Sequence, residues 1–293
     1  MATGTVPISR VDESAFDWTV LVQVIEADRV KIARDGDLSR SFHWFEFGDF
    51  QGIKVSAIAF DDDVAIVDGR LLPFRNYYIS NAEVREIPDL VGTGLYSFYR
   101  VIKEGTTIEE AAGSWELALP FYFELRSFQY FHFVPDTDIF INVMGVVIHA
   151  LPPRDVYFEG SKRYGRDYII VDQCKRPVVL TLWDDYESIE GCVINESMVS
   201  MPIIIAMRVR VTTRNYLSLS TQPSSVIIVA PDVLEAKHLD DWSNANISEL
   251  VRMIFDDMAY LDPCVLLPPV RDATLIPIYN VISHAKSVAN RVL

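Results

Sequence analysis

The sequence predicts a mainly β protein made of two small five-stranded barrels in tandem, followed by helices. Half of the 293 residues are hydrophobic and only 23% are charged, so the chain can bury sizeable cores, and its length suits about two domains. A series of strand-like segments separated by polar turns runs through residues 18–104, and a similar series starts again near residue 138. Two copies of one small barrel fit this repeated order better than one large sandwich.

The first series begins with the β-rich run "FDWTVLVQVIEA", which the polar turn "RDGDLSRS" follows. Next, "FHWFEFGD" and "IKVSAIAFDDD" flank the turn "FQG", and together they predict a β-hairpin. "RNYYISNAEVREI" and "LYSFYRVIKEG" supply further strands, and the Gly- and Pro-containing "PDLVGTG" between them predicts a loop.

The second series repeats this order. "DIFINVMGVVIHALPPRDVYF" predicts a long strand with a break at Pro152 and Pro153, and "RDYIIVDQCKRPVVLTLWDD" predicts a hairpin that turns near Lys175 and Arg176. "MPIIIAMRVRVTTRNYLSLST" and "SSVIIVAPD" supply the closing strands. The aromatic-rich "FYFELRSFQYFHFVP" would connect the two barrels, and its composition predicts packing rather than a flexible linker.

The C-terminal segments have a different period. "NISELVRMIFDDMAYL" and "IYNVISHAKSVANRVL" both place apolar residues at helical spacing. We expect the last apolar stripe to dock on its own domain or on a partner protein. The expected organisation is an N-terminal extension at 1–14, a first barrel at 15–110, a connector at 111–135, a second barrel at 136–243 and a helical region at 244–293.

Charge and composition restrict the function classes. The formal net charge of −15 disfavours loose binding to polyanions, because nonspecific nucleic-acid affinity comes mainly from Lys and Arg. Cys174, Cys192 and Cys264 are dispersed, which is typical of reduced, buried thiols rather than a disulfide or zinc site. The N-terminal "MATGTVPISR" lacks the apolar core of a signal peptide, and no apolar run reaches the roughly 18 residues that span a membrane. We therefore expect an intracellular protein with no membrane partner.

Motifs of catalysis are absent from the sequence. The five histidines have no metal-ligand spacing to one another, and no Walker loop, G-x-S-x-G or H-E-x-x-H occurs. Paired carboxylates such as Asp240-Asp241 and Asp256-Asp257 are more typical of solvated helix faces than of acid–base pairs. We expect no enzyme activity, no cofactor, no metal and no small-molecule substrate.

Motifs of the second barrel carry a resemblance to a known family. A hairpin ending in T-L-W, an R-V strand, an S-L-S strand, a P-D dipeptide and a closing tryptophan follow one another at Asp172, Thr181–Trp183, Met207–Val211, Ser218–Ser220, Ala230–Asp232 and Trp242. This order resembles the second central single-stranded-DNA-binding OB fold of the replication protein A large subunit. The first barrel is similar to that family's preceding OB fold through Trp18-Thr19, the hairpin from "FEFGDFQG" to "SAIAF", and Tyr77-Tyr78.

The resemblance extends from about Trp18 to Trp242. The matching region does not include the family's N-terminal protein-docking OB fold or its C-terminal zinc-containing OB fold. The chain therefore looks like a shorter two-OB paralogue, of a meiotic or telomeric kind, or a fragment-like relative, rather than the replication subunit itself. It implies a nuclear protein that binds single-stranded DNA in replication, repair, recombination or telomere maintenance. It also implies a groove across both barrels, in which bases stack on aromatic rings and basic side chains follow the backbone.

Residues that match the family's binding positions are then candidates. In the first barrel the stacking positions match Phe60 and either Phe98 or Tyr96. The basic positions match Lys31 and Arg85, and the arginine expected on the hairpin falls on Ser56 or, with a slip of the alignment, on Lys54. In the second barrel they are Trp183 for stacking and Arg210 for the backbone, with Arg214 at the second stacking position and Tyr216 nearby. The basic run "SKRYGR" adds Lys162, Arg163 and Arg166, which we expect on a basic loop at the mouth of the barrel.

Two alternatives stay open at the sequence level. Phe60 also fits a core residue at a strand end, and Trp18, Trp44 and Trp242 fit core or closing positions. Aspartates follow both expected stacking rings, at 61–63 and 184–185, and their charge would repel phosphates. The competing hypothesis is therefore an acidic tandem-OB scaffold with weak or lost nucleic-acid binding, which assembles with a protein partner through its C-terminal helices.

Overall fold

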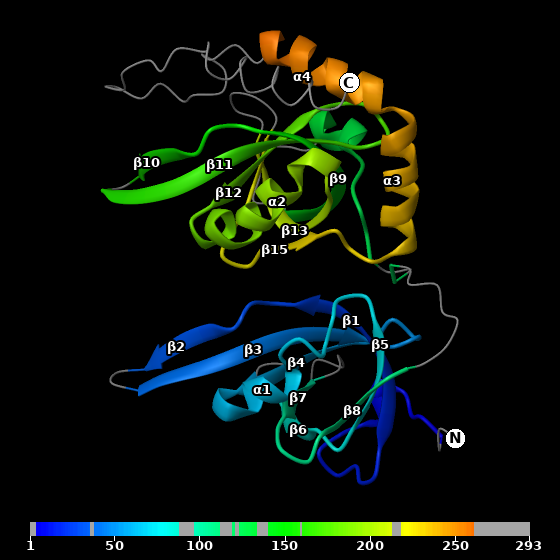
Figure 1. Cartoon of the computed structure of the whole chain (residues 1–293). Helices are drawn as coiled ribbons and strands as arrows, with labels where there is room; N and C mark the ends of the chain where they lie inside the picture. The colour runs from blue at the N-terminus through cyan, green and yellow to red at the C-terminus, as the bar shows by residue number, and fades with distance from the viewer. Residues whose placement is uncertain are drawn as a thin grey trace. The chain divides into compact units, whose positions relative to one another are not determined.

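The computed structural model describes residues 4–35, 38–87, 97–111, 119–120, 123–133, 140–158, 160–212 and 218–260. The chain divides into two compact units, Met1–Phe123 and Glu124–Leu293, and each is a curled β-sheet with short helices (Figure 1). The predicted mainly β fold with two barrels and C-terminal helices is confirmed. The expected helix around residues 278–292 lies outside the described residues.

The first unit is one sheet in the order β6-β7-β4-β3-β1-β5-β8, with β2 paired to β3. Its elements are η1 (Ile8–Arg10), β1 (Thr19–Ala27), β2 (Lys31–Asp35), β3 (Leu38–Gly48), β4 (Lys54–Phe60), η2 (Asp61–Asp63), α1 (Val64–Val67), β5 (Asn76–Ser80), β6 (Glu83–Glu86), β7 (Phe98–Ile102) and β8 (Thr107–Glu110). The turn predicted between β3 and β4 is present, and β2 with β3 forms a second hairpin (Figure 1).

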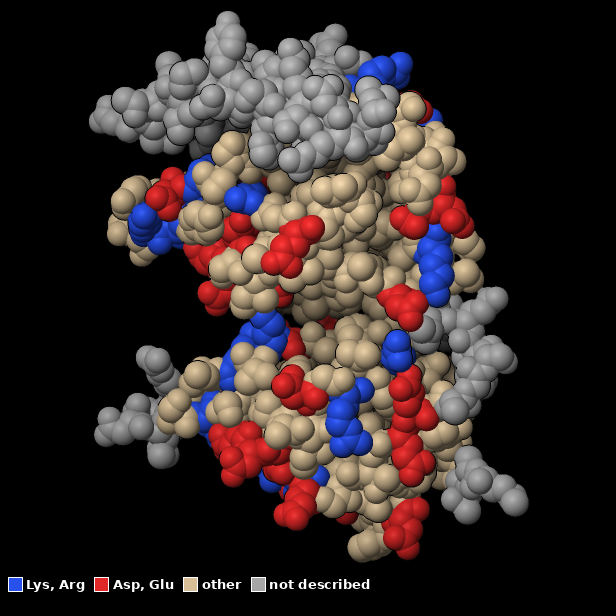
Figure 2. Space-filling model, viewed as in Figure 1, with Lys and Arg blue, Asp and Glu red and all other residues tan. Residues whose placement is uncertain are grey.

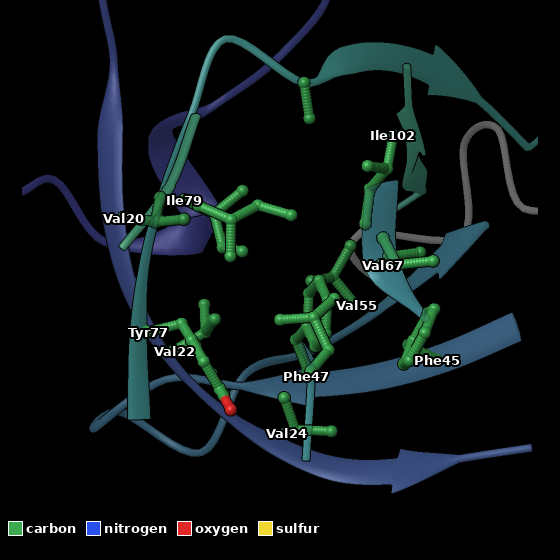
Figure 3. Packing of buried hydrophobic residues seen from close by; sticks show 14 of the residues in the cluster. Val20, Val22, Val24, Phe45, Phe47, Val55, Val67, Tyr77, Ile79 and Ile102 are labelled. Atoms are coloured by element: carbon green, nitrogen blue, oxygen red, sulfur yellow. The ribbon is translucent and has the colours of Figure 1, made fainter. Parts of the chain in front are cut away.

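Alternating apolar residues of the first unit build its core. In β4, Val55, Ala57 and Ala59 are buried while the residues between them are less so, which is the period of a strand with one face on a core. Figure 3 shows Phe45, Phe47 and Ile79 directed into this core together with Val67 of α1.

The N-terminal segment belongs to this core. Ile8 and Val11 are almost completely buried in it, and the backbone N–H of Ile8 donates to the carboxylate of Asp49 at 3.1 Å. The segment expected as an extension at 1–14 therefore packs on the first barrel through Ile8 and Val11.

The second unit closes on itself. Its strands are β9 (Phe140–Ala150), β10 (Arg154–Phe158), β11 (Ser161–Val171), β12 (Val178–Trp183), β13 (Ile203–Thr212), β14 (Ser218–Ser220) and β15 (Val226–Val229). The pairs β9–β11, β11–β12, β12–β14, β14–β13 and β13–β9 form a ring of five strands. Closure leaves the ring without a free edge, so that β10 and β15 flank it.

Helices and one aromatic segment complete the second unit. The helices are η4 (Phe128–Phe133), the π-helix η5 (Glu187–Gly191), α2 (Cys192–Ser197), η6 (Met198–Ser200), α3 (Leu234–Ala245) and α4 (Ile247–Tyr260). Phe128 and Phe131 lie fully buried in its core cluster. The aromatic segment predicted to pack does so, against the second barrel.

Candidate nucleic-acid interface

Phe60 ends β4 on the outer face of the first sheet. Alternation along β4 places Phe60 and Ile58 on the half-buried face and Ala59 in the core. Phe42 of β3 pairs directly with Phe60, and Trp44 pairs with Ile58. The ring predicted to stack therefore belongs to an outer aromatic group of Phe42, Trp44 and Phe60, and it is not a core side chain.

The predicted basic residues of the first unit each have a carboxylate partner. Lys31 of β2 pairs across the hairpin with Phe42 and makes an ion pair with Asp28. The ammonium of Lys54 lies 3.3 Å from Glu46. Because the charges of these two lysines are already neutralised in part, each would bind a phosphate less strongly than an unpaired lysine would.

Arg85 lies in a small charged cluster on β6. Its guanidinium donates to Glu83 at 2.6 Å, and Lys103 donates to the other oxygen of Glu83 at 2.6 Å. The hydrogen bond from Arg85, followed by that from Lys103, lowers the pKa of Glu83 to about 2. The carboxylate therefore stays ionised and holds both cations at neutral pH.

Phe98, the second expected stacking ring, starts β7 on the side of Arg100 and Ile102. Both of those residues are buried, and the guanidinium of Arg100 lies 5.4 Å from the ring centroid of Trp18. Alternation puts Tyr99 on the opposite side, where it faces Arg85 across the β6–β7 pair. Strand geometry thus favours Tyr99 over Phe98 as a neighbour of the outer face. Tyr96 lies outside the described residues.

Trp183 ends β12 as Phe60 ends β4, again on the outer face. Its strand partner is Gly165 of β11, and its indole Nε1–H donates to the hydroxyl of Ser220 at 2.9 Å. A Cβ on Gly165 would lie 2.6 Å from Cε3 of Trp183. The indole is therefore seated on a glycine and fixed by one hydrogen bond.

Arg210 shares that face with Trp183. It is exposed on β13, and its cross-strand partners are Ser220 on one side and Phe140 of β9 on the other. Phe140 is 50% exposed. Ser220 therefore links the predicted stacking residue to the predicted backbone contact, and Phe140 adds an aromatic ring beside the arginine.

The basic run that was expected as a loop at the mouth of the barrel is instead part of a strand, which divides its side chains between two faces. Residues 161–171 form β11, so Arg163 lies on the Trp183 side while Lys162 and Arg166 lie on the other. Lys162 pairs with Asp155 at 2.9 Å, and the guanidinium of Arg166 lies 3.1 Å from the buried Glu187. The structure brings only Arg163 of these three next to Trp183, at 5.2 Å from the ring centroid.

The aspartates that follow the rings are paired with arginines. Asp61 accepts from Arg40 Nε at 2.7 Å, and Asp184 accepts from Arg163 Nε at 2.8 Å. Both aspartates have positive φ angles, 50° and 52°, a conformation that Asp tolerates better than most residues. The repulsion expected from these two carboxylates is therefore reduced by a cation on each of them.

A buried carboxylate holds one of the arginines near Trp183. Asp167 accepts from the hydroxyl of Thr181 at 2.6 Å and makes an ion pair with Arg154, and its side chain is only 2% exposed. The guanidinium of Arg154 lies 5.7 Å from the Trp183 ring centroid. This network fixes Arg154, because breaking it would leave a buried carboxylate unpaired.

On the opposite side of β11, Tyr168 donates to Glu187 at 2.7 Å. Burial raises the pKa of Glu187, and the hydrogen bond from Tyr168 and the nearby Arg166 oppose that rise in part. Burial also raises the pKa of Tyr168.

Charges of both signs are mixed on the surface. In the view of Figure 2, Lys and Arg lie among Asp and Glu on both units rather than in one basic area. Among the described residues, no group of three or more His, Cys, Asp or Glu side chains is placed to hold a metal ion, and no helix has the length and hydropathy needed to cross a membrane. Cys174 is half-buried and Cys192 is exposed, so the expected burial is wrong for Cys192. Arg214, Tyr216 and Cys264 lie outside the described residues.

Residues that the sequence did not single out complete both faces: Phe42, Arg40, Arg154, Gly165 and Phe140. Hairpin register was the signal that could have found the first four, because each lies on a strand paired beside Phe60 or Trp183. Phe140 required the pairing of β9 with β13, which joins segments about 70 residues apart.

Known proteins are similar to this chain in sequence and in fold. No family model matches the sequence. A replication protein A 70 kDa DNA-binding subunit of Oryza sativa subsp. japonica is 24% identical over 238 residues, which cover 80% of this chain and 38% of that protein. A replication protein A 70 kDa DNA-binding subunit of Arabidopsis thaliana is 23% identical over 254 residues, 83% of this chain and 39% of that protein. The chain thus spans about two fifths of the length of these curated relatives.

A solved structure of a replication protein A heterotrimer bound to single-stranded DNA matches 82% of this chain and 55% of its own chain, with a TM-score of 0.65 and 20% sequence identity. This match shows the same fold over both units. The resemblance that the motifs predicted is confirmed.

Proposed function

From the confirmed resemblance to the replication protein A large-subunit family, we propose that this chain binds single-stranded DNA, with each unit stacking bases on its outer aromatic residues. The observation that carries the proposal is the equivalent placement of Phe60 and Trp183. Each ring ends the fourth strand of its unit, on the face turned away from the core, with basic residues on the paired strands. A solved relative of this fold is bound to single-stranded DNA.

Stacking rather than net charge would supply most of the affinity. Base–aromatic stacking contributes about 1–3 kcal/mol per base and tolerates any sequence. Lys31, Lys54, Arg85 and Arg163 already have carboxylate partners, and the whole chain is acidic. We therefore expect a sequence-tolerant binder whose affinity falls less steeply with salt than that of a basic groove.

The wider role follows the family. We propose that the protein acts in the nucleus without catalysis, in DNA replication, repair, recombination or telomere maintenance. We also propose a protein partner for the C-terminal helical region, because Ile247 at the start of α4 is an exposed large apolar residue, although Leu250 one turn later is buried within this chain. The observation favouring the alternative, an acidic scaffold that has lost DNA binding, is the partnering of the basic residues with carboxylates.

Titration of a fluorescent oligo-dT with the full chain, at low and at moderate salt, distinguishes these functions. The double variant Phe60→Ala/Trp183→Ala should bind at least about 30-fold more weakly, which corresponds to the lower limit for two stacked bases. Phe50→Ala/Tyr157→Ala is the matched control, because both of those rings are exposed and neither lies on the outer aromatic faces. If the wild-type chain does not bind the oligonucleotide at low salt, that result contradicts the proposal and favours the alternative function of an acidic scaffold.

A further inference from the structure

The same three-residue arrangement occurs in both units. In the first unit, Asp61 accepts from Arg40 Nε at 2.7 Å and from the backbone N–H of Ser41 at 3.0 Å. The guanidinium carbon of Arg40 also lies 4.2 Å from the centroid of the Phe60 ring. Arg40, Asp61 and Phe60 thus form one connected group.

The second unit repeats each contact. Asp184 accepts from Arg163 Nε at 2.8 Å and from the backbone N–H of Tyr164 at 2.9 Å. The guanidinium carbon of Arg163 lies 5.2 Å from the centroid of the Trp183 ring. In both units the arginine stands two residues before the strand partner of the ring. An isolated surface ion pair would not be expected to recur with the same backbone hydrogen bond, so we treat the arrangement as one functional contact and name it the arginine latch.

The latch occupies space that a base would need. A base between the ring and the guanidinium requires planes roughly 7 Å apart, twice the about 3.5 Å of a carbon–carbon contact. The 4.2 Å separation over Phe60 is too short for that. A base can therefore stack on the covered side of Phe60 only if Arg40 moves away.

We propose that Arg40 and Arg163 are gating residues, each of which leaves its ring and its aspartate when a base stacks and then binds a phosphate of the same strand. This inference rests on the proposed function. A guanidinium suits both states, because it stacks on aromatic faces and pairs with carboxylate or phosphate through the same donors.

Exposure makes the latch able to open. The side chains of Arg40 and Asp61 are 60% and 48% exposed, and those of Arg163 and Asp184 are both 44% exposed. Ion pairs at such exposure are weak. Arg154, also near Trp183, differs because its partner Asp167 is buried, so it stays in place when Arg163 moves.

Matched charge variants test the gate. Asp61→Asn and Asp62→Asn change the charge equally, but only the first weakens the latch; Asp184→Asn and Asp185→Asn form the same pair in the second unit. Asn also tolerates the positive φ at both latch positions. All four variants and the wild-type full chain would be titrated with the fluorescent oligo-dT over a range of salt concentrations.

We expect Asp61→Asn and Asp184→Asn to bind up to about fivefold more tightly than their neighbours, the equivalent of releasing one exposed ion pair. Arg40→Ala and Arg163→Ala should each reduce the slope of log K against log salt by about 0.7, the value for one phosphate of a single strand. Equal affinities within each aspartate pair, or arginine variants with an unchanged slope, would overturn the gate. Those results require a wild-type chain that binds; a wild-type chain that binds nothing instead refutes the proposed function.

Discussion

Gly165→Ala is the substitution that most sharply probes how the second face is built. The added Cβ would lie 2.6 Å from Cε3 and 2.8 Å from Cζ3 of Trp183, and 3.2 Å from the carbonyl oxygen of Leu182. Contacts this short force the indole to move, and overpacking of this kind costs about 1–3 kcal/mol. A displaced indole also loses its 2.9 Å hydrogen bond to Ser220, worth about 0.5–1.5 kcal/mol.

The assay is a double-mutant cycle with Trp183→Ala, followed by urea unfolding of the second unit. Gly165→Ala alone should lower the free energy of unfolding by about 1–3 kcal/mol. In the Trp183→Ala background it should be neutral or stabilise by up to about 1 kcal/mol, because glycine inside a strand is itself unfavourable. The oligo-dT affinity of Gly165→Ala should fall toward that of Trp183→Ala. A cost that is the same in both backgrounds would refute the seating of the indole on Gly165.

The other predictions concern the cores and the buried acid. Phe128→Ala should lower the free energy of unfolding of the second unit by about 3–5 kcal/mol and leave the unfolding transition of the first unit unchanged, as followed by urea denaturation. Destabilisation of the first unit instead of the second would contradict the packing of the Phe128 segment on the second barrel. Ile8→Ala should cost the first unit about 2–5 kcal/mol, and loss of less than about 0.5 kcal/mol, the usual range of surface substitutions, would show that the N-terminal segment does not pack. Burial raises the pKa of Glu187 above 4.5 in the folded protein. The contribution that Glu187 makes to the free energy of unfolding is therefore fully present below pH 4.5, and it is lost as the pH rises through the folded-state pKa of Glu187. The stability of Glu187→Gln relative to wild type should therefore increase with pH from 4.5 upward, measured by thermal unfolding, and a difference that is independent of pH would contradict this.

Regular alternation made most of the fold predictable. Burial alternates along β4, and a polar turn separates it from β3. The strand β12 is instead a short, nearly continuous apolar run, the other pattern that is typical of a buried strand. The N-terminal "VPISRV" has no such period, since only Ile8 and Val11 enter the core. Its burial depends on a tertiary contact with Asp49 that local sequence does not encode.

Short motifs predicted the positions of two candidate residues better than those of the basic run. Trp183 and Arg210 stand in such motifs, and strand alternation places them on one face. "SKRYGR" indicated a basic loop, but it lies in a strand, which turns neighbouring side chains to opposite faces and so separates Arg163 from Arg166. From the sequence, Asp184 was expected to repel phosphates. Its partner Arg163 is 21 residues away along the chain, and only the register of β11 and β12 brings the two side chains together.

Photo-crosslinking tests the central claim of base stacking most directly. An oligonucleotide carrying 5-iodouracil would be irradiated with the full chain, and the crosslinked peptides would be mapped by mass spectrometry. We predict adducts at Phe60 and Trp183, or at Phe42, which pairs with Phe60, and Phe140, which pairs with Arg210. Adducts confined to Phe50 and Tyr157, or none at all under conditions where the oligonucleotide is bound, would contradict base stacking on these faces.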